Sequence, residues 1–245
     1  MNKLMCHVVA GYPDPEACLR LMLGMQASGA AAIEVQIPFS DPIADGETIM
    51  EANDMALAGG MTTAASFSLI EKARAQGLKS DIYIMSYLQK VLHFGFDNFC
   101  DDASTCGAKG LIIPDLPYDS PEYKELTVYT HNLGLELVPV LSPGMLEGRL
   151  RALLASNPPT VYVTSSRGIT GNEYSPAAEL GQLVGEVRKL SEAEIMIGFG
   201  ISTPGDVREA LTIGDIAVVG SAVIKIIQES GVNSTLKFVK TLAAG

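Results

Sequence analysis

The sequence predicts a single (β/α)8 barrel, an α/β TIM-barrel domain spanning residues 1–245. A chain of 245 residues with 47% hydrophobic and 18% charged side chains is long and apolar enough to bury the core of one such domain. Short apolar segments alternate with longer segments of helical periodicity, which is the pattern of a parallel sheet covered by helices. Eight such pairs follow one another without a linker or a repeat, and this number favours a closed barrel over an open sheet.

Eight segments have the length and composition of β-strands. Most are apolar throughout, as expected for strands that are covered on both faces. In a barrel of this class, the residues that follow the carboxyl ends of these strands form the active site. The predicted strands are Leu4–Val9, Ala32–Gln36, Asp81–Met85, Gly110–Ile113, Glu136–Val140, Thr160–Val163, Glu194–Ile197 and Ile216–Val219.

The segments between the strands carry apolar residues three and four positions apart, which predicts helices. One helix start is well marked, because Thr203 can cap, Pro204 suits the first helical position and Asp206 favours the first turn. Little or no helix is expected before the strand that begins at Leu4. The predicted helices are Pro15–Gln26, Thr62–Ala75, Phe96–Cys106, Pro121–Leu133, Leu146–Ala155, Ala177–Leu190, Pro204–Ile213 and Ala222–Glu229, with Asn233–Leu242 as a terminal helix.

Charge and composition argue against several classes of function. The formal net charge of −11 and the absence of a basic stripe argue against nucleic acid and anionic membranes as partners. The first apolar run ends at Gly11-Tyr12-Pro13, too soon for a signal peptide or a membrane span, so a cytoplasmic location is expected. Neither a disulfide framework nor a metal site is expected, because the cysteines and histidines lack close spacing. These residues are Cys6, Cys18, Cys100, Cys106, His7, His93 and His131.

The stretch from Ala31 to Met50 is the best candidate for a catalytic centre. Glu34 lies inside the apolar strand Ala32–Gln36, and a carboxyl group inside a closed sheet loses hydration, which suits it to exchange a proton near neutral pH. Eleven residues later, Asp45 lies in a segment rich in proline, serine, aspartate and glycine that can fold back over the end of the strand. We therefore expect Glu34 and Asp45 to act together.

Two glycine motifs near the C-terminus indicate a phosphate site. Gly198-Phe199-Gly200-Ile201-Ser202 follows the seventh predicted strand, and Val219-Gly220-Ser221 follows the eighth and opens a helix. Glycine lets backbone N–H groups approach an anion, and a helix N-terminus adds a favourable dipole. The alternative is that these glycines only form tight turns.

The polar, glycine-containing segment from Thr164 to Glu173 follows the sixth predicted strand. Such a segment suits a loop that closes over a ligand, although its composition fits an exposed connector equally well. Tyr87 and Tyr162 stand near the ends of strands, where aromatic residues are more often packing than catalytic.

The motif PFSDPIADG after a strand that carries a glutamate resembles the tryptophan synthase α-subunit family, and the likeness extends over nearly the whole chain. The resemblance implies retro-aldol cleavage of indole-3-glycerol phosphate to indole and glyceraldehyde 3-phosphate without a metal or an organic cofactor. It assigns the proton transfers to Glu34 and stabilisation of the positive charge on the indole ring to Asp45.

The same resemblance implies roles for the binding residues. Thr170 would meet the Asp45 loop on closure, and Asp115 would shape a loop. The remaining residues would bind the indole or donate backbone N–H groups to the phosphate; they are Tyr87, Tyr162, Gly171, Phe199, Gly200, Gly220 and Ser221.

The resemblance also implies a partner, a tryptophan synthase β-subunit that carries pyridoxal phosphate, contacts Asp41 and Pro42, receives the indole and forms an αββα tetramer with this chain. The sequence departs from the family pattern in several places. It has Gln36 for glycine, Glu47 for proline, Met50 for glutamine and Gln89 for asparagine, and His7 stands where an apolar residue is usual. No catalytic role is expected for His7, which we expect to be a satisfied or surface-facing histidine.

Two alternatives remain open on the sequence. One is another phosphate-binding barrel isomerase or lyase, which the fold permits equally well. The other is a non-catalytic relative that activates a β-subunit.

Overall fold

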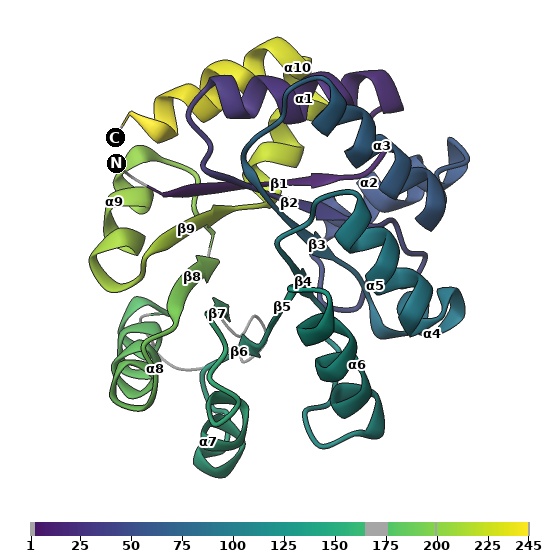
Figure 1. Ribbon diagram of the computed structural model, residues 1–245. Helices are drawn as coiled ribbons and strands as arrows, with labels where there is room; N and C mark the ends of the chain where they lie inside the picture. Colours follow the sequence, from purple (N-terminus) through teal and green to yellow (C-terminus); the bar gives the residue numbers. More distant parts are fainter. Residues whose placement is uncertain (1–2, 165–175, 199, 245) are drawn as a thin grey trace.

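The computed structural model describes residues 3–164, 176–198 and 200–244. In this part of the chain, a parallel sheet of nine strands forms the centre and ten helices lie around it, as a single (β/α)8 barrel (Figure 1). The strands are β1 (Leu4–Val9), β2 (Ala32–Gln36), β3 (Asp81–Met85), β4 (Gly110–Ile112), β5 (Glu136–Val138), β6 (Val140–Leu141), β7 (Thr160–Thr164), β8 (Glu194–Gly198) and β9 (Ile216–Val219).

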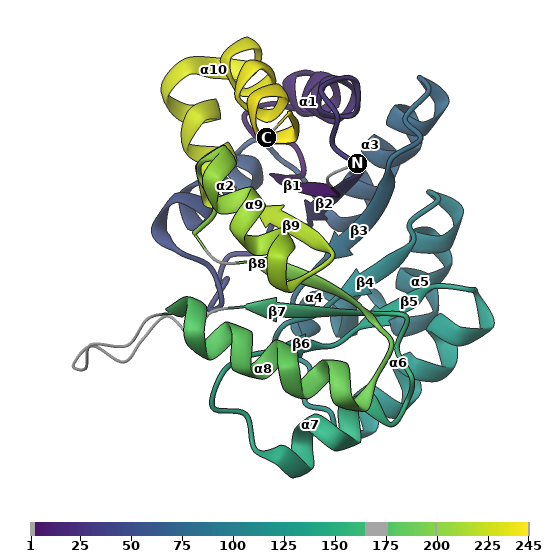
Figure 2. The ribbon, with the colours of Figure 1, turned by 90° about the vertical axis from the view of Figure 1, so that its left-hand side faces the viewer.

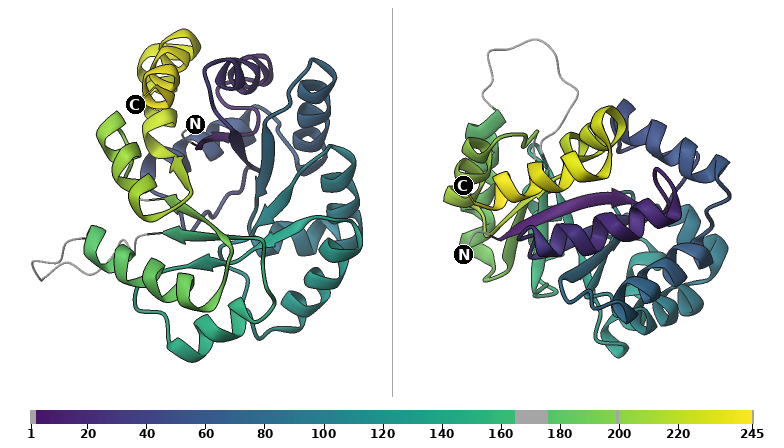
Figure 3. Two further views of the ribbon diagram at one scale, coloured as in Figure 1. Left: turned by 60° about the vertical axis from the view of Figure 1, so that its left-hand side comes forward. Right: turned by 90° about the horizontal axis from the view of Figure 1, so that it is seen from above.

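The helices lie outside the strands in every view (Figures 1 and 3). They are α1 (Pro15–Ala27), α2 (Glu47–Ala58), α3 (Thr63–Ala75), α4 (Leu88–Phe94), α5 (Phe96–Thr105), α6 (Pro121–Asn132), α7 (Glu147–Leu154), α8 (Pro176–Leu190), α9 (Pro204–Ile213) and α10 (Ser221–Ala243).

The two ends of the sheet meet at Pro139. The predicted fifth strand is divided into β5, which pairs with β4, and β6, which pairs with β7, and Pro139 lies between them. Proline has no N–H group to donate to a neighbouring strand, which explains the break in the ladder. Its carbonyl still accepts a hydrogen bond of 2.9 Å from the Tyr162 N–H. The eight predicted strands are therefore all present, the fifth in two pieces.

Two helices differ from the sequence prediction, and the C-terminal pair agrees with it. Helices α2 and α4 were not predicted, because the first follows a loop rich in proline and glycine and the second has only seven residues. The two predicted C-terminal helices are both present within α10, where they meet at a kink at Gly231, whose φ is 73°. Glycine adopts this left-handed conformation without a steric penalty, so the chain changes direction there.

Alternate residues of each strand face the barrel interior, where they form an inner cluster separate from the layer between strands and helices. Met5 and Tyr83 belong to this inner cluster, whereas Cys6 and Ile82 pack toward the helices. The parallel register pairs His7 of β1 with Glu34 of β2, and Glu34 with Tyr83 of β3. This alternation directs Glu34 inward.

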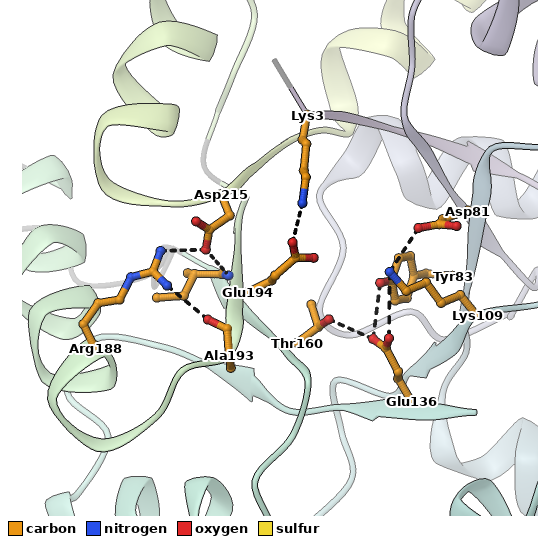
Figure 4. Close-up of polar contacts among 11 residues, drawn as sticks. Lys3, Asp81, Tyr83, Lys109, Glu136, Thr160, Arg188, Ala193, Glu194 and Asp215 are labelled. Atoms are coloured by element: carbon orange, nitrogen blue, oxygen red, sulfur yellow. Dashed lines mark hydrogen bonds and ion pairs between the residues drawn. The ribbon is translucent and has the colours of Figure 1, made fainter. Parts of the chain in front are cut away.

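Polar side chains join the strands at their amino-terminal ends (Figure 4). The Glu136 carboxylate accepts hydrogen bonds from the hydroxyls of Thr160 at 2.8 Å and Tyr83 at 3.3 Å. Lys109 forms ion pairs with Glu136 and Asp81, and two further ion pairs, Lys3–Glu194 and Arg188–Asp215, lie at the same end. Each exposed pair contributes little stability, so the main effect of the network is to fix the relative positions of the strand starts.

Helix α10 packs alongside α1 on the outside of the barrel (Figures 2 and 3). The Leu236 side chain occupies the space beside Gly24 of α1, and Val239 and Leu242 are fully buried in the layer between strands and helices. These C-terminal residues therefore cover a side of the barrel and not its amino-terminal end. None of the helices in the described ranges is long and apolar enough to cross a membrane.

Candidate active site

A cavity of about 820 Å³ opens at the carboxyl ends of the strands. Its walls come from several strands and the loops that follow them, as the fold predicts. His7, Glu34, Asp45, Tyr162 and Gly220 all line it, although they lie far apart in the sequence. The structure thus brings the predicted acidic residues and part of the predicted phosphate site to one cavity.

Glu34 is held inside the barrel by β2. Every residue of this strand is buried, and Glu34 is only 5% exposed. Its Oε2 atom lies 2.8 Å from Nδ1 of His7. A buried carboxylate needs a polar or charged partner, and the imidazole is one.

Asp45 lies in the loop between β2 and α2, where it is partly buried. Its Oδ2 atom accepts a hydrogen bond of 2.6 Å from the Gln36 amide and one of 3.0 Å from the Tyr87 hydroxyl. Burial raises the pKa of Asp45, an effect that these hydrogen bonds and the His7 ring oppose and that Glu34 reinforces. The two carboxylates therefore lie near enough to repel each other, and their joint action stays a prediction.

The loop that carries Asp45 is anchored by residues that the sequence analysis did not identify. Asn53 of α2 is fully buried, and its carbonyl oxygen accepts a hydrogen bond of 2.9 Å from the Phe39 N–H. The Phe39 ring packs against Tyr87, with 5.3 Å between ring centroids. The position of Asn53 on the buried face of α2 could have identified it from the sequence, but only if that helix had been predicted.

The two tyrosines have different positions. Tyr162 lines the cavity, and burial together with the charges of Glu34 and Asp45 raises the pKa of its hydroxyl. Tyr87 is fully buried beside Asp45 and does not line the cavity, which differs from the expectation that both tyrosines form the wall. Its hydroxyl also accepts a hydrogen bond of 3.1 Å from the Ala44 N–H, so it supports the loop.

Glycines form part of the cavity wall. Gly198 lies against the Tyr162 ring, since a Cβ atom at this position would collide with the tyrosine hydroxyl. Gly200, Gly220 and Ser221 line the cavity too, and Ser221 is the first residue of α10. A helix N-terminus bordered by glycines offers backbone N–H groups to an anion. Three residues singled out from the sequence lie outside the described part of the chain; they are Thr170, Gly171 and Phe199.

Other predicted residues lie around this centre. Asp41 is exposed, Pro42 is buried and the neighbouring Ile43 is 73% exposed, so the tip of the loop presents apolar surface. The Asp115 carboxylate accepts a hydrogen bond of 2.8 Å from the Leu88 N–H, so it caps the start of α4. Three departures from the family pattern, Glu47, Met50 and Gln89, lie on helix surfaces, whereas Gln36 belongs to the centre itself.

The expectation for His7 needs correction. Its ring is neither at the surface nor fully satisfied: its residue is 3% exposed, Nδ1 contacts Glu34, and Nε2 has no hydrogen-bond partner among the described residues. Every residue of β1 is buried, so the strand lacks the alternation of buried and exposed residues that would show which face of the sheet carries His7. Its register opposite Glu34 decides this.

The arrangement suits proton transfer to and from a neutral organic group beside a bound anion. Two carboxylates line the cavity, a tyrosine ring can pack against an apolar group, and Gly220 and Ser221 at the start of α10 line the same cavity. Among the described residues, no three His, Cys, Asp or Glu side chains form a group that could hold a metal ion.

Comparisons with known proteins place this site in a family context. The family model described as "Tryptophan synthase alpha chain" matches residues 1–244. The tryptophan synthase alpha chain of Carboxydothermus hydrogenoformans is 38% identical over 225 residues, which cover 92% of this chain and 83% of that one. The Granulibacter bethesdensis alpha chain is 37% identical over 223 residues, covering 91% and 80%.

Solved structures agree. A ligand-free tryptophan synthase from M. tuberculosis superposes with a TM-score of 0.89 at 28% identity, covering 99% of this chain and 92% of that one. A chain of the tryptophan synthase complex from Pyrococcus furiosus gives a TM-score of 0.87 at 30% identity, covering 99% and 98%.

Proposed function

This chain belongs to the tryptophan synthase alpha chain family, and from that premise we propose that it is a lyase that cleaves indole-3-glycerol phosphate to indole and glyceraldehyde 3-phosphate. The observation that carries the proposal is the convergence of Glu34 and Asp45 on one cavity with Gly220 and Ser221. The reaction needs acidic groups and an anion site in one cavity. In this proposal residues 1–245 form the one domain that supplies both.

Glu34 performs the proton transfers in this proposal. It protonates the indole ring carbon that bears the side chain and takes the proton from the side-chain hydroxyl, so that the bond between ring and side chain breaks and a carbonyl forms. Protonation of the ring places positive charge on the ring nitrogen. Asp45 stabilises this charge, and it does so more in the transition state than in the ground state.

The substrate phosphate binds to backbone N–H groups in this proposal. Gly200, Gly220 and Ser221 line the cavity, and Gly171 and Phe199 complete the site as the family resemblance implies. The α10 N-terminus favours an anion even though the whole chain carries a formal charge of −11, because the field at short range decides binding. Tyr162 packs against the indole ring, and Thr170 meets the Asp45 loop on closure.

We further propose that the partner is a tryptophan synthase β-subunit in an αββα tetramer. The relative from Pyrococcus furiosus is described as a tryptophan synthase complex. The contact includes Asp41 and Pro42, beside the exposed Ile43. No cofactor is assigned to this chain, and pyridoxal phosphate belongs to the partner. The expected cytoplasmic location stays a prediction.

An indole-release assay tests the proposal. Glu34→Gln keeps the shape of the side chain but removes the exchangeable proton, so turnover of indole-3-glycerol phosphate should fall by about 10²- to 10⁴-fold. Glu136→Gln is the matched control, because Glu136 is also hydrogen-bonded within the barrel but lies at the amino-terminal end. Near-normal turnover in a folded Glu34→Gln protein would reject Glu34 as the proton-transfer group.

The same assay separates the two alternatives. An isomerase or other lyase of this fold would leave indole-3-glycerol phosphate intact. A non-catalytic relative would release no indole alone or with a β-subunit, yet would still raise the activity of the β-subunit.

A further inference from the structure

His7 and Glu34 form a buried pair in the wall of the cavity. They are register partners on the parallel strands β1 and β2, and their side chains are 4% and 7% exposed. The Nδ1 to Oε2 distance of 2.8 Å is that of a strong hydrogen bond. Buried charges are stable only when they are paired and hydrogen-bonded, so the state of each member depends on the other.

The surroundings of His7 favour a charged ring. Burial opposes the charge, but the Glu34 carboxylate, its hydrogen bond, the Asp45 carboxylate and the Gln36 side chain together outweigh burial and raise the pKa of His7. Among the described residues that line the cavity, the one further charged side chain is Arg149 of α7, whose guanidinium lies over the Tyr118 ring. Strand β9 presents Val218 and Gly220, and β7 presents the Tyr162 hydroxyl.

The second ring nitrogen of His7 also favours the charged, doubly protonated ring. Among the described residues, Nε2 of His7 and Oε1 of Gln36 are both buried without a hydrogen-bond partner. A protonated Nε2 is a donor and Oε1 is an acceptor, so the two unsatisfied atoms are complementary. The Gln36 amide nitrogen already contacts Asp45 at 2.6 Å. Gln36 therefore lies between the His7–Glu34 pair and the second carboxylate.

We propose that His7 is a positioning residue for Glu34: its imidazolium holds one carboxylate oxygen and supplies the positive charge between the two acidic groups of the cavity. This inference rests on the function proposed above. The proton stays on Nδ1, and Glu34 exchanges protons with the substrate through its other oxygen. Gln36 links this pair to Asp45 through its amide, which donates a hydrogen bond to the Asp45 carboxylate.

The positive charge of His7 counteracts the repulsion between Glu34 and Asp45. Two carboxylates that share a buried cavity repel each other, and each would be displaced or neutralised without a nearby cation. The His7 charge offsets this repulsion without entering the reaction. It also fixes the direction of the Glu34 side chain, and misplacement of a catalytic group by about 1 Å can cost about 100-fold in rate.

NMR titration of the imidazole nitrogens tests the pair without substrate. In the wild type, the His7 signals should titrate above pH 6.5, the ordinary midpoint for histidine, and in Glu34→Gln the midpoint should move to lower pH. The exposed His93 and His131 provide internal reference signals in the same spectra. An unchanged His7 midpoint in Glu34→Gln would overturn the proposed pair.

Kinetics test the role. His7→Asn places a neutral amide donor where Nδ1 lies, and His7→Leu removes both the donor and the charge. Because the folded-state pKa of His7 is raised, its charge is present at low pH and is lost as the pH rises through that value. Wild-type kcat should therefore fall on the alkaline side, and His7→Asn should lack that limb. His7→Leu should lower kcat up to about 100-fold with a small change in KM.

The outcomes separate this inference from the proposed function. A wild type that releases no indole rejects the function, and the NMR titration then still decides whether the pair exists. A wild type that releases indole with the same alkaline limb as His7→Asn rejects the positioning role. A merely structural histidine would lower the stability of both variants without moving the pH profile.

Discussion

Removal of the Tyr87 hydroxyl should lower activity by displacing Asp45. This hydroxyl donates to Asp45 at 3.0 Å and accepts from the Ala44 N–H at 3.1 Å, so it ties the loop to the start of α4. Tyr87→Phe removes both hydrogen bonds and keeps the ring, which packs on Phe39. Any loss therefore reports on the loop and not on the core.

The size of the effect follows from these contacts. A hydrogen bond to a charged group contributes about 1.5–3 kcal/mol, and one between neutral groups about 0.5–1.5 kcal/mol. Ala44 is exposed, so water can replace its lost partner, and the contact to Asp45 dominates. If the ordered loop loses that stabilisation relative to its other arrangements, kcat/KM falls roughly tenfold to a hundredfold, since each 1.4 kcal/mol is about a factor of ten.

Indole release and thermal unfolding should be measured on the same preparations. Tyr83→Phe is the matched control: Tyr83 lies on β3, the strand that precedes Tyr87, and belongs to the same inner cluster, but its hydroxyl contacts Glu136 at the amino-terminal end. We expect both variants to lose some stability and only Tyr87→Phe to lose activity. An activity loss in Tyr87→Phe no larger than that in Tyr83→Phe would refute the assignment of Tyr87 to the Asp45 loop.

Three further predictions concern the phosphate site, the partner and the tyrosine wall. Gly220→Asp should raise KM and weaken binding of glycerol phosphate in calorimetry, whereas Gly220→Ala should not, because a Cβ there meets nothing closer than 3.8 Å; equal affinities would place the phosphate elsewhere. Asp41→Ala should reduce activation by a titrated β-subunit more than it reduces the basal rate, and equal activation of the wild type and the variant would exclude this route. Gly198→Ala should push the Tyr162 hydroxyl into the cavity and raise KM, and it should lower the free energy of unfolding by only about 1 kcal/mol, because the ring can move into the open cavity. An unchanged KM would show that the position of Tyr162 does not affect substrate binding.

Much of the fold was predictable because its signals are local. Apolar strands and helical periodicity gave the barrel and the order of its elements, and Glu34 stood out because an acid inside an apolar strand is unusual. The missed helix α4 shows the limit. Its first N–H group is capped by Asp115 from another strand end, a contact that no local pattern reveals.

The sequence by itself therefore determined the barrel, the candidate pair Glu34 and Asp45, and the glycines beside the last strands. Only the tertiary structure decided that His7 faces Glu34, that Gln36 joins Asp45 to this pair, and that Tyr87 supports the loop instead of the cavity wall. The reason is geometric. Strand β1 is buried at every position, so its facing has no local signature, and only its pairing with β2 and β9 in a closed barrel directs His7 inward.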